Sequence, residues 1–269
     1  YMYCVIMMKT DKDGAIMQVK LVITDLDRTF LRDDKTVSSY ATSVIEEMRR
    51  RGILFMIATA RPEIAVKQFI PSLSFDYAVY HNGALVDFCD GHVLHYGISS
   101  EIAMQICQSL LKSYPEEKIA IEMENMRYSN FPATDIWPGA DFIYTDFTDL
   151  PKKVAEKILI PMNGVYHHKF QEFLPDDLYM QISENTLCMI MNRKARKLTG
   201  IQSICDKVGI ELSEIVAFGD DLNDIEMIKA CGIGVAVSNA LDEVKSAATE
   251  ICGSNEEDGV AKWIEANLL

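Results

Sequence analysis

The stretch Val19-Lys20-Leu21-Val22-Ile23-Thr24 runs directly into Asp25-Leu26-Asp27-Arg28-Thr29. Its first part is apolar enough to form a buried strand, and two carboxylates follow at the point where that strand ends. In an open parallel sheet, ligands bind just beyond the carboxyl ends of the strands. A carboxylate placed there can attack phosphorus, and its neighbour can carry a proton. Asp-x-Asp is also common in turns and helix caps, so the rest of the chain must decide between these uses.

Composition narrows the class of protein. The chain has 269 residues, of which 49% are hydrophobic, and Asp+Glu 40 against Lys+Arg 26 gives a formal net charge of −14. Such an acidic protein repels nucleic acid and anionic membranes, so neither is an expected partner. The seven cysteines form no CxxC pair, which indicates reduced thiols and a cytoplasmic location. No apolar run approaches the roughly 18 residues of a membrane span.

Strands and helices alternate at both ends of the chain. Apolar runs predict buried strands, and segments with helical spacing of apolar residues follow them. The expected strands after the first are 54–58, 77–80, 215–218 and 233–237, and the expected helices are 38–50, 63–70, 198–207, 222–230, 239–248 and 259–267. This alternation predicts an α/β fold with a doubly wound parallel sheet, a Rossmann-like core.

The middle of the chain has a different pattern. The turn signals Asn82-Gly83 and Asp90-Gly91 separate short strands, expected at 84–88 and 92–96. Further strand pairs separated by helices then predict an α+β domain with an antiparallel sheet, inserted into the core. We therefore expect an N-terminal extension at 1–17, a core domain made of 18–83 and 193–269, and an inserted cap domain at 84–192.

A second acidic motif follows the expected strand at 215–218. It is Gly219-Asp220-Asp221-Leu222-Asn223-Asp224, in which Gly219 permits a tight turn. Asp220 and Asp224 are four residues apart and fall on one side of a starting helix. Carboxylate oxygens at a strand end suit Mg²⁺, which prefers hard oxygen ligands. The alternative is that Asp220 or Asp221 only caps the helix.

Two further polar residues are expected at the same edge of the sheet. Thr59 ends the strand at 54–58, where its hydroxyl can donate to a phosphoryl oxygen, although it can equally be an ordinary helix cap. Lys197 begins the helix at 198–207, where its charge can neutralise phosphate, although most lysines lie on the surface. Thr59 directly follows an expected core strand, as the two acidic motifs do, and Lys197 directly precedes an expected core helix. The four features together therefore favour one phosphoryl-transfer site.

These motifs in combination resemble those of the haloacid dehalogenase-like (HAD) superfamily. Within it, the sequence is similar to the Cof-type phosphatases, which carry a large α+β cap, called a C2 cap, between their second and third motifs. Four motifs carry the resemblance: Asp25-Leu26-Asp27-Arg28-Thr29, Thr59, Lys197, and Gly219-Asp220-Asp221-Leu222-Asn223-Asp224. Asn82-Gly83-Ala84 and Asn239-Ala240 also match the subfamily. The similarity covers about residues 18–267.

The resemblance implies a Mg²⁺-dependent phosphatase that acts through an aspartyl-phosphate. Asp25 would be the nucleophile and a metal ligand, and Asp27 the general acid/base, with its backbone carbonyl on the metal. Asp220 would complete the protein ligands, and Asp224 would orient Lys197 or a water on the metal. The groups expected to hold the phosphoryl oxygens are Thr59, the amides of Leu26 and Ala60, Lys197 and Asn223.

The sequence departs from the family pattern at two positions. Residues 28 and 60 are usually Gly in this family, and here they are Arg28 and Ala60. Alanine is tolerated if its φ stays negative. Arg28 has two interpretations: its guanidinium can contact the substrate or a cap carboxylate, or its side chain can merely obstruct the loop.

The expected substrate is a small phosphorylated metabolite, with sugar phosphates favoured, and the expected assembly is a monomer or homodimer. One alternative is a phosphosugar mutase, which needs basic cap residues facing the site. The candidates for that role are Arg127, Lys152, Lys153, Lys157 and Lys169. A catalytically silent module that binds a phosphorylated metabolite is the other alternative, and Arg28 is the one feature in its favour.

Overall fold

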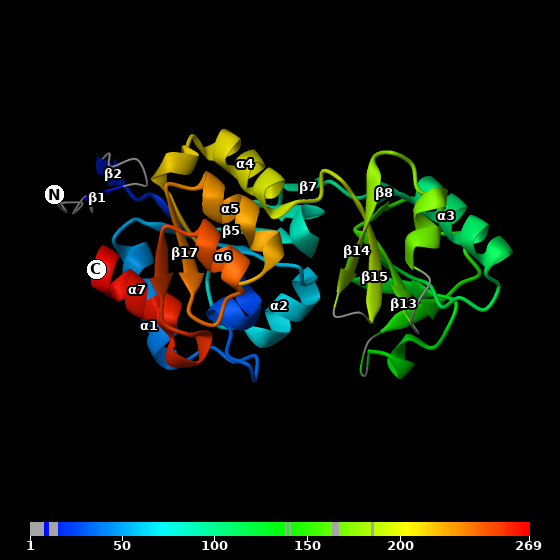
Figure 1. Cartoon of the computed structure of the whole chain (residues 1–269), viewed down its shortest axis with the longest axis horizontal. Helices are drawn as coiled ribbons and strands as arrows, with labels where there is room; N and C mark the ends of the chain where they lie inside the picture. Colours follow the sequence, from blue (N-terminus) through cyan, green and yellow to red (C-terminus); the bar gives the residue numbers. More distant parts are fainter. Residues whose placement is uncertain (1–7, 11–15, 138, 140, 163–166, 184–185) are drawn as a thin grey trace. The chain divides into compact units, whose positions relative to one another are not determined.

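The computed structural model describes residues 8–10, 16–137, 139, 141–162, 167–183 and 186–269. The chain divides into two compact units, which we call unit 1 (Tyr1–Val93 and Arg196–Leu269) and unit 2 (Leu94–Ala195). Unit 1 therefore contains both ends of the chain, and unit 2 is one continuous insertion, drawn mainly in green in Figure 1.

Unit 1 is built on an eight-stranded sheet with the strand order β18-β17-β16-β3-β4-β5-β6-β7. Its strands are β3 (Leu21–Thr24), β4 (Leu54–Ala58), β5 (Tyr77–Tyr80), β6 (Leu85–Asp87), β7 (Val93–His95), β16 (Ile215–Gly219), β17 (Ile233–Val237) and β18 (Glu250–Cys252). The strands from β18 to β5 are parallel, and β6 joins β5 antiparallel. Because the chain moves outward from β3 in both directions, the sheet is doubly wound, which confirms the predicted fold class.

The helices of unit 1 cover this sheet. They are α1 (Ser39–Arg50), α2 (Glu63–Phe69), α4 (Lys197–Val208), α5 (Ile225–Ala230), α6 (Asp242–Ala247) and α7 (Gly259–Leu268). Helix α1 packs against α7, and α5 packs against α4 and α6. Figure 1 shows β17 running between α1 and α7 on one side and α5 and α6 on the other. The predicted helix at 38–50 begins as expected, because the Ser38 hydroxyl caps it by accepting from the amide of Ala41 at 2.9 Å.

The boundary of the inserted unit differs from the expected range of 84–192. Strands β6 and β7, which the sequence pattern placed in the insertion, extend the core sheet beyond β5. A tight turn at His81–Gly83 folds β6 back along β5, so its backbone groups pair with a core strand. The inserted unit begins at Leu94, within β7, and it ends at Ala195 instead of residue 192.

Unit 2 contains a six-stranded sheet with the order β11-β10-β9-β13-β15-β14. Its elements are α3 (Ser100–Ser113), β8 (Ile98–Ser99), β9 (Ala120–Met123), β10 (Met126–Ser129), β11 (Phe142–Tyr144), β12 (Val154–Ala155), β13 (Lys157–Pro161), β14 (Leu178–Ser183), β15 (Leu187–Asn192) and a 3₁₀ helix at His167–Phe173. The sheet is antiparallel as predicted, except that β11 runs parallel to β10. Its buried cluster includes residues of α3 and of several strands, so unit 2 has a core of its own.

Residues 1–17 were expected to precede the fold. There β1 (Met8–Thr10) pairs antiparallel with β2 (Ile16–Gln18), which extends one residue beyond that range, while 1–7 and 11–15 lie outside the described residues. The predicted helix at 164–173 is likewise described only from His167 onward, where it is a 3₁₀ helix. Among the described residues, no helix combines the length and the apolar character that crossing a membrane requires.

Candidate active site

Three neighbouring parallel strands carry candidate residues directly after their carboxyl ends. Strand β3 lies between β16 and β4, with Thr24 paired to Phe218 on one side and to Ile57 on the other. Asp25, Thr59 and Asp220 are the next residues along β3, β4 and β16 respectively. The amide of Asp25 also donates to the carbonyl of Phe218 at 3.0 Å, which fixes the first turn after β3 against β16. These strand ends lie at one edge of the sheet.

Lys197 begins α4, and its side chain is buried between two carboxylates. Its Nζ donates to Asp25 Oδ1 at 2.6 Å and to Asp224 Oδ1 at 2.7 Å. Burial raises the pKa of Asp25 well above its usual range, because the attraction of Lys197 is too weak to offset it and Asp224 adds repulsion. Burial disfavours a charged Lys197, but the carboxylates of Asp224 and Asp25 outweigh it and raise the lysine pKa. The ammonium group is therefore charged at neutral pH.

Asp224 also holds the loop in which it lies. Its Oδ2 accepts from the backbone amides of Asp220 at 3.0 Å and Asp221 at 3.2 Å. A Cβ atom on Gly219 would lie 2.5 Å from the Cβ of Asp224, so only glycine fits there. The helix-capping alternative for this motif is also realised, because Asp221 accepts from the amide of Leu222 at 2.7 Å. One motif thus combines capping with a buried carboxylate cluster.

The cluster has the donor atoms that a metal ion requires. Carboxylate oxygens of Asp25, Asp220 and Asp224 lie within 4.8 Å of one another, and all three residues are buried. Asp220 Oδ1 accepts from the Thr29 hydroxyl at 2.7 Å, yet burial still raises the pKa of Asp220 to about 6. Three buried carboxylates against the one ammonium of Lys197 leave an excess of negative charge. A divalent cation would offset that excess, so the residues present fit Mg²⁺.

Asp27 makes contacts that the sequence did not indicate. Arg61 donates to its two carboxylate oxygens from Nε and Nη2, each at 2.5 Å, and Lys35 Nζ donates to Oδ1 at 2.9 Å. Burial alone would raise the pKa of Asp27, but the hydrogen bonds from Arg61 and Lys35 outweigh it and lower that pKa. The Arg61 guanidinium is itself placed over the Phe69 ring at 4.5 Å. Arg61 could have been predicted as a site residue, because it follows Thr59 by two residues. Nothing in the spacing of Lys35 indicated that it lies at the site.

The residues expected to hold phosphoryl oxygens come from three loops. Thr59 is fully buried, and its Oγ1 accepts from the amide of Arg61 at 3.2 Å, which leaves its own proton free to donate. Asn223 Nδ2 donates to Asn82 Oδ1 at 2.9 Å. The two positions expected to supply backbone amides are Leu26, which is buried, and Ala60, which is half-buried.

Arg28 has the backbone conformation that glycine favours. Its φ is 56° and its ψ is 7°, in the left-handed region. The side chain is exposed, and the backbone carbonyl accepts from Asn239 Nδ2 at 2.7 Å. This conformation gives a physical reason why the family usually has glycine at this position, and it means that arginine here destabilises the loop.

Replacing this residue should therefore stabilise the protein. We expect Arg28→Gly to raise the free energy of unfolding by about 1 kcal/mol, or the melting temperature by roughly 2–4 °C, because glycine adopts positive φ without steric cost. Arg28→Ala is the matched control, since it removes the guanidinium but keeps the Cβ atom. Thermal denaturation of both variants checks the expectation, and equal melting temperatures for the two would contradict it.

Kinetics of the same two variants test the role of the Arg28 side chain. A higher KM in both variants indicates that the side chain contacts the substrate, whereas a higher kcat indicates that it obstructs the loop.

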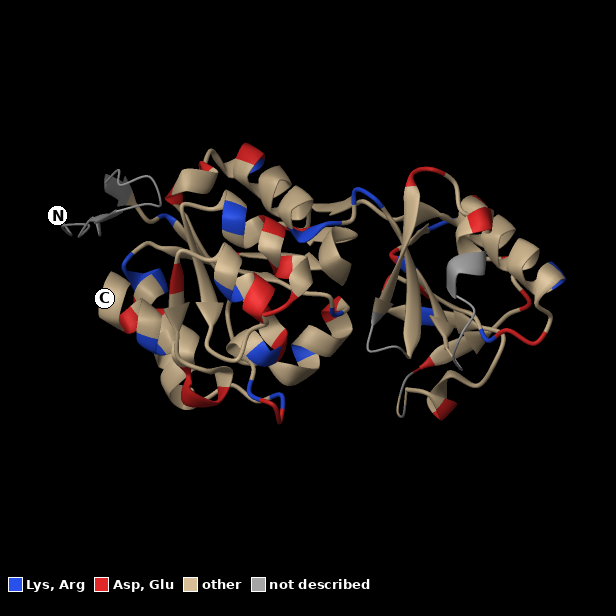
Figure 2. Ribbon diagram, viewed as in Figure 1, with Lys and Arg blue, Asp and Glu red and all other residues tan. Residues whose placement is uncertain are grey.

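Most of the basic residues considered for a mutase function already have acidic partners. Arg127 and Lys157 both pair with Glu122, at 2.8 Å and 3.1 Å, and Lys153 pairs with Glu124. Lys152 is exposed, and the side chain of Lys169 lies outside the described residues. Figure 2 shows red and blue segments interspersed along the ribbons of each unit. Pairing of this kind reduces the positive charge that a second phosphate would need.

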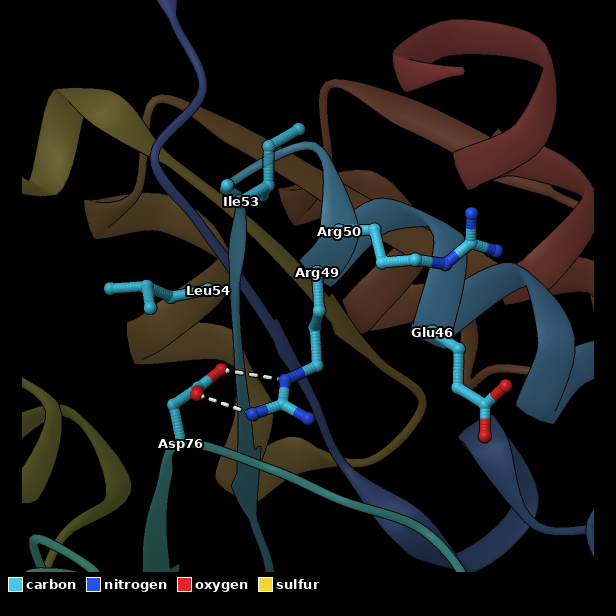
Figure 3. Close-up of a pocket in the computed structure, with 7 residues that line it drawn as sticks. Glu46, Arg49, Arg50, Ile53, Leu54 and Asp76 are labelled. Atoms are coloured by element: carbon cyan, nitrogen blue, oxygen red, sulfur yellow. Dashed lines mark hydrogen bonds and ion pairs between the residues drawn. The ribbon is translucent and has the colours of Figure 1, made fainter. Parts of the chain in front are cut away.

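A pocket of about 470 Å³ lies at the opposite ends of the core strands (Figure 3). It involves Leu54, where β4 begins, and Asp76, which directly precedes β5. Arg49 extends toward Asp76 and pairs with both of its carboxylate oxygens, at 2.6 Å and 3.0 Å. Asp76 also accepts from the amide of Phe55 at 2.9 Å. These contacts join α1 to the sheet, and the pocket lies away from the strand ends that carry the acidic cluster.

Comparison with known proteins identifies the class. The family model for haloacid dehalogenase-like hydrolases matches residues 22–264, so the chain belongs to this family. It is a HAD-like phosphatase, and the resemblance drawn from its four motifs is confirmed.

The relatives extend over almost the whole chain. The 5-amino-6-(5-phospho-D-ribitylamino)uracil phosphatase YitU of Bacillus subtilis is 27% identical over 265 residues, covering 91% of this chain and 96% of the relative. A haloacid dehalogenase-like hydrolase from Bacteroides thetaiotaomicron has a similar structure, with a TM-score of 0.79, 22% identity, and coverage of 93% of this chain and 99% of that one. A HAD subclass IIB sugar phosphatase gives a TM-score of 0.74 at 21% identity, covering 92% and 98%. At these identities the solved structures support the fold.

Proposed function

We propose that this protein is a Mg²⁺-dependent phosphatase that hydrolyses a small phosphorylated metabolite through an aspartyl-phosphate on Asp25. The observation that carries the proposal is the buried contact of Lys197 with Asp25 and Asp224, next to Asp220, at the ends of the core strands. Phosphoryl transfer chiefly needs positioning and charge neutralisation, and this cluster supplies both.

In the first step, a carboxylate oxygen of Asp25 forms a bond to phosphorus while the bond from phosphorus to the ester oxygen breaks. Asp27 in its protonated form gives its proton to the departing oxygen, so the alcohol leaves neutral. Arg61 and Lys35 stabilise the ionised form of Asp27 in the described conformation. We therefore infer that these pairs open when the substrate binds, before the first proton transfer.

In the second step, a water oxygen attacks phosphorus and the bond to the Asp25 oxygen breaks. Asp27 accepts a proton from the attacking water, and inorganic phosphate leaves. Ionised Asp27, held by Arg61, suits this step. Both carboxyl groups then return to their starting states, and the hydroxyl of Thr59, the amide of Asn223 and the ammonium of Lys197 hold the transferring oxygens throughout.

The metal would be held by carboxylate oxygens of Asp25 and Asp220 and by the backbone carbonyl of Asp27. Asp224 lies in the same cluster but already binds Lys197 and two backbone amides, so we assign it an orienting role. When bound, Mg²⁺ neutralises charge on the phosphoryl oxygens.

Chelation should therefore abolish activity. We expect EDTA to remove turnover, Mg²⁺ to restore it, and Ca²⁺ to fail, because Ca²⁺ takes more ligands at longer distances. Mg²⁺ should also raise the melting temperature of the protein without substrate, since it offsets repulsion among three buried carboxylates. In Asp220→Asn this thermal shift should shrink. Full activity in the chelator, with no shift on adding Mg²⁺, would contradict the metal assignment.

Two substrate groups are supported by different observations. Sugar phosphates are the group favoured by the resemblance, and a ribitylamino-uracil phosphate is favoured by the activity for which relatives such as YitU are named. We propose a cytoplasmic enzyme, as a monomer or homodimer. Release of inorganic phosphate from a panel of both groups, with and without Mg²⁺, tests the proposal. Hydrolysis of no phosphate ester in Mg²⁺ would favour the silent binding module.

A mutase function has less support. It requires a second set of basic residues for the other phosphate of a bisphosphate, and Arg127, Lys153 and Lys157 are paired with Glu122 or Glu124. Isomerisation of a hexose phosphate in the presence of its bisphosphate, without net release of phosphate, would reverse this ranking.

A further inference from the structure

The turn at His81–Gly83 contacts all three segments that carry the proposed phosphate-binding side chains. We propose that Asn82 is a positioning residue, which orients the Asn223 amide and links it to the Thr59 loop so that both bind one phosphoryl group. The proposal rests on the function given above, because it assigns a role within the same site.

The side chain of Asn82 is buried, with 6% of the residue exposed. Its backbone amide donates to the carbonyl of Thr59 at 2.9 Å, and its Oδ1 accepts from Asn223 Nδ2 at 2.9 Å. One residue thereby connects the loop after β4 to the loop after β16, although neither loop is near it in sequence. Both bonds lie within unit 1.

The third segment is the start of α4. Gly83 has a φ of 107°, and a Cβ atom placed on it would lie 2.2 Å from the carbonyl oxygen of Arg196. The turn therefore packs directly against the backbone that precedes Lys197. Only glycine permits this approach, and it brings the turn next to the residue that delivers the buried ammonium.

The backbone of the turn has a strained conformation, and these contacts hold it in that conformation. His81 and Asn82 have φ values of 50° and 56°, so two consecutive residues with side chains occupy the left-handed region. Such conformations persist where the surrounding structure imposes them, and they are concentrated at functional sites. Asparagine tolerates this region better than most residues and also supplies the accepting oxygen, which explains its use here.

The bond to Asn82 fixes which way the Asn223 amide faces. Asn82 Oδ1 can only accept, so it selects the nitrogen of Asn223, and the second N–H of that nitrogen remains for an anion. Asn223 Oδ1 is buried and has no hydrogen-bond partner among the described residues. Within the described part of the chain, Asn82 is therefore the group that orients this amide.

A double-mutant cycle tests the proposal. Asn82→Gly removes the side chain while glycine keeps the positive φ, and Asn223→Ala removes the amide that it orients. We expect each single variant to weaken binding of inorganic phosphate in Mg²⁺, measured by calorimetry, by about 10- to 100-fold. The double variant should be no weaker than Asn223→Ala within about threefold, because Asn82 acts through Asn223.

His81→Gly is the matched control, since it removes a buried side chain from the same turn and gives the backbone the same freedom. Its effect should multiply with that of Asn223→Ala, as expected for independent contributions. If Asn82→Gly does not fold, as judged by its thermal transition, Asn82→Ser is the second variant, since it removes the side-chain amide and shortens the side chain.

Two results would overturn the proposal: unchanged phosphate affinity in Asn82→Gly, or effects of Asn82→Gly and Asn223→Ala that multiply. Failure of the wild-type protein to hydrolyse any phosphate ester would instead count against the proposed function. Phosphate binding would still report the coupling between Asn82 and Asn223 in that case.

Discussion

Asp25→Asn is expected to lower turnover by about 10⁴-fold or more, because a neutral amide cannot form the bond to phosphorus. The amide has almost the same shape as the carboxylate, so Lys197 keeps its contact with Asp224 and the fold should be retained. Steady-state release of phosphate from the best substrate in a screen measures the loss, and circular dichroism checks the fold.

Asp242→Asn is a suitable control for the chemical change. Asp242 lies at the start of α6 with 98% of its side chain exposed, so loss of its charge should leave turnover unchanged. Retention of more than a few per cent of activity in a folded Asp25→Asn protein would rule out the aspartyl-phosphate route. Trapping of radiolabelled phosphate on the wild-type protein, and not on the variant, would support it directly.

Lys197→Met should have the largest effect on stability. The ammonium is buried against Asp25 and Asp224, and removing one partner of a buried ion pair usually costs about 3–5 kcal/mol. Turnover should also fall sharply, because the positive charge that we propose for binding the phosphoryl group is lost. Chemical denaturation in metal-free buffer measures the first effect, and phosphate release in Mg²⁺ measures the second.

The stability deficit should depend on pH with a definite sign. The folded-state pKa of Asp25 is already raised by burial, and loss of Lys197 raises it further. A carboxyl group with a raised folded-state pKa destabilises the fold as the pH rises above its unfolded pKa. The deficit of Lys197→Met should therefore be smallest where Asp25 is protonated in both folded proteins, and it should grow as the pH rises above the folded-state pKa of Asp25 in the wild-type protein.

Lys207→Met on the same helix is the control, because Lys207 is 40% exposed in its side chain and pairs with Asp90 at the surface. Its stability should change little at any pH, since exposed pairs contribute little. If the two substitutions lowered the stability of the protein equally, the burial of Lys197 would not explain its contribution to stability.

The parts of the fold that depend on local pattern were predictable. Strands β4, β5 and β17 have the expected bounds, because a short run of buried apolar residues with polar residues at both ends has few alternatives. Asp25 and Asp220 were found in the same way, since each follows such a run. Their mutual approach could be inferred because neighbouring parallel strands end at the same edge.

The parts that depend on distant residues were not predictable. The turn signals around β6 and β7 are the same whether these strands belong to the core or to the insertion. Only the pairing of β6 with β5, and the place of β7 next to β6, decides between the two. β18, a short strand at the edge of the sheet, was missed for the same reason. The contact of Arg61 with Asp27 depends on the relative position of two loops, and the positive φ of Arg28 depends on its turn.

The order of the strands has a consequence for synthesis of the protein. One parallel pair inside the core sheet, β3 with β16, joins Leu21 to Ile215, so it cannot form until the whole of unit 2 has been translated. Unit 2 is continuous and has its own buried cluster, so it can fold while the first half of unit 1 still waits for its partner strands. Exposed apolar strands on the ribosome are open to aggregation, and here they are β3, β4 and β5. This exposure should end once β16 has been made. Nascent chains that are released after residue 219 should therefore aggregate less than chains that are released before β16.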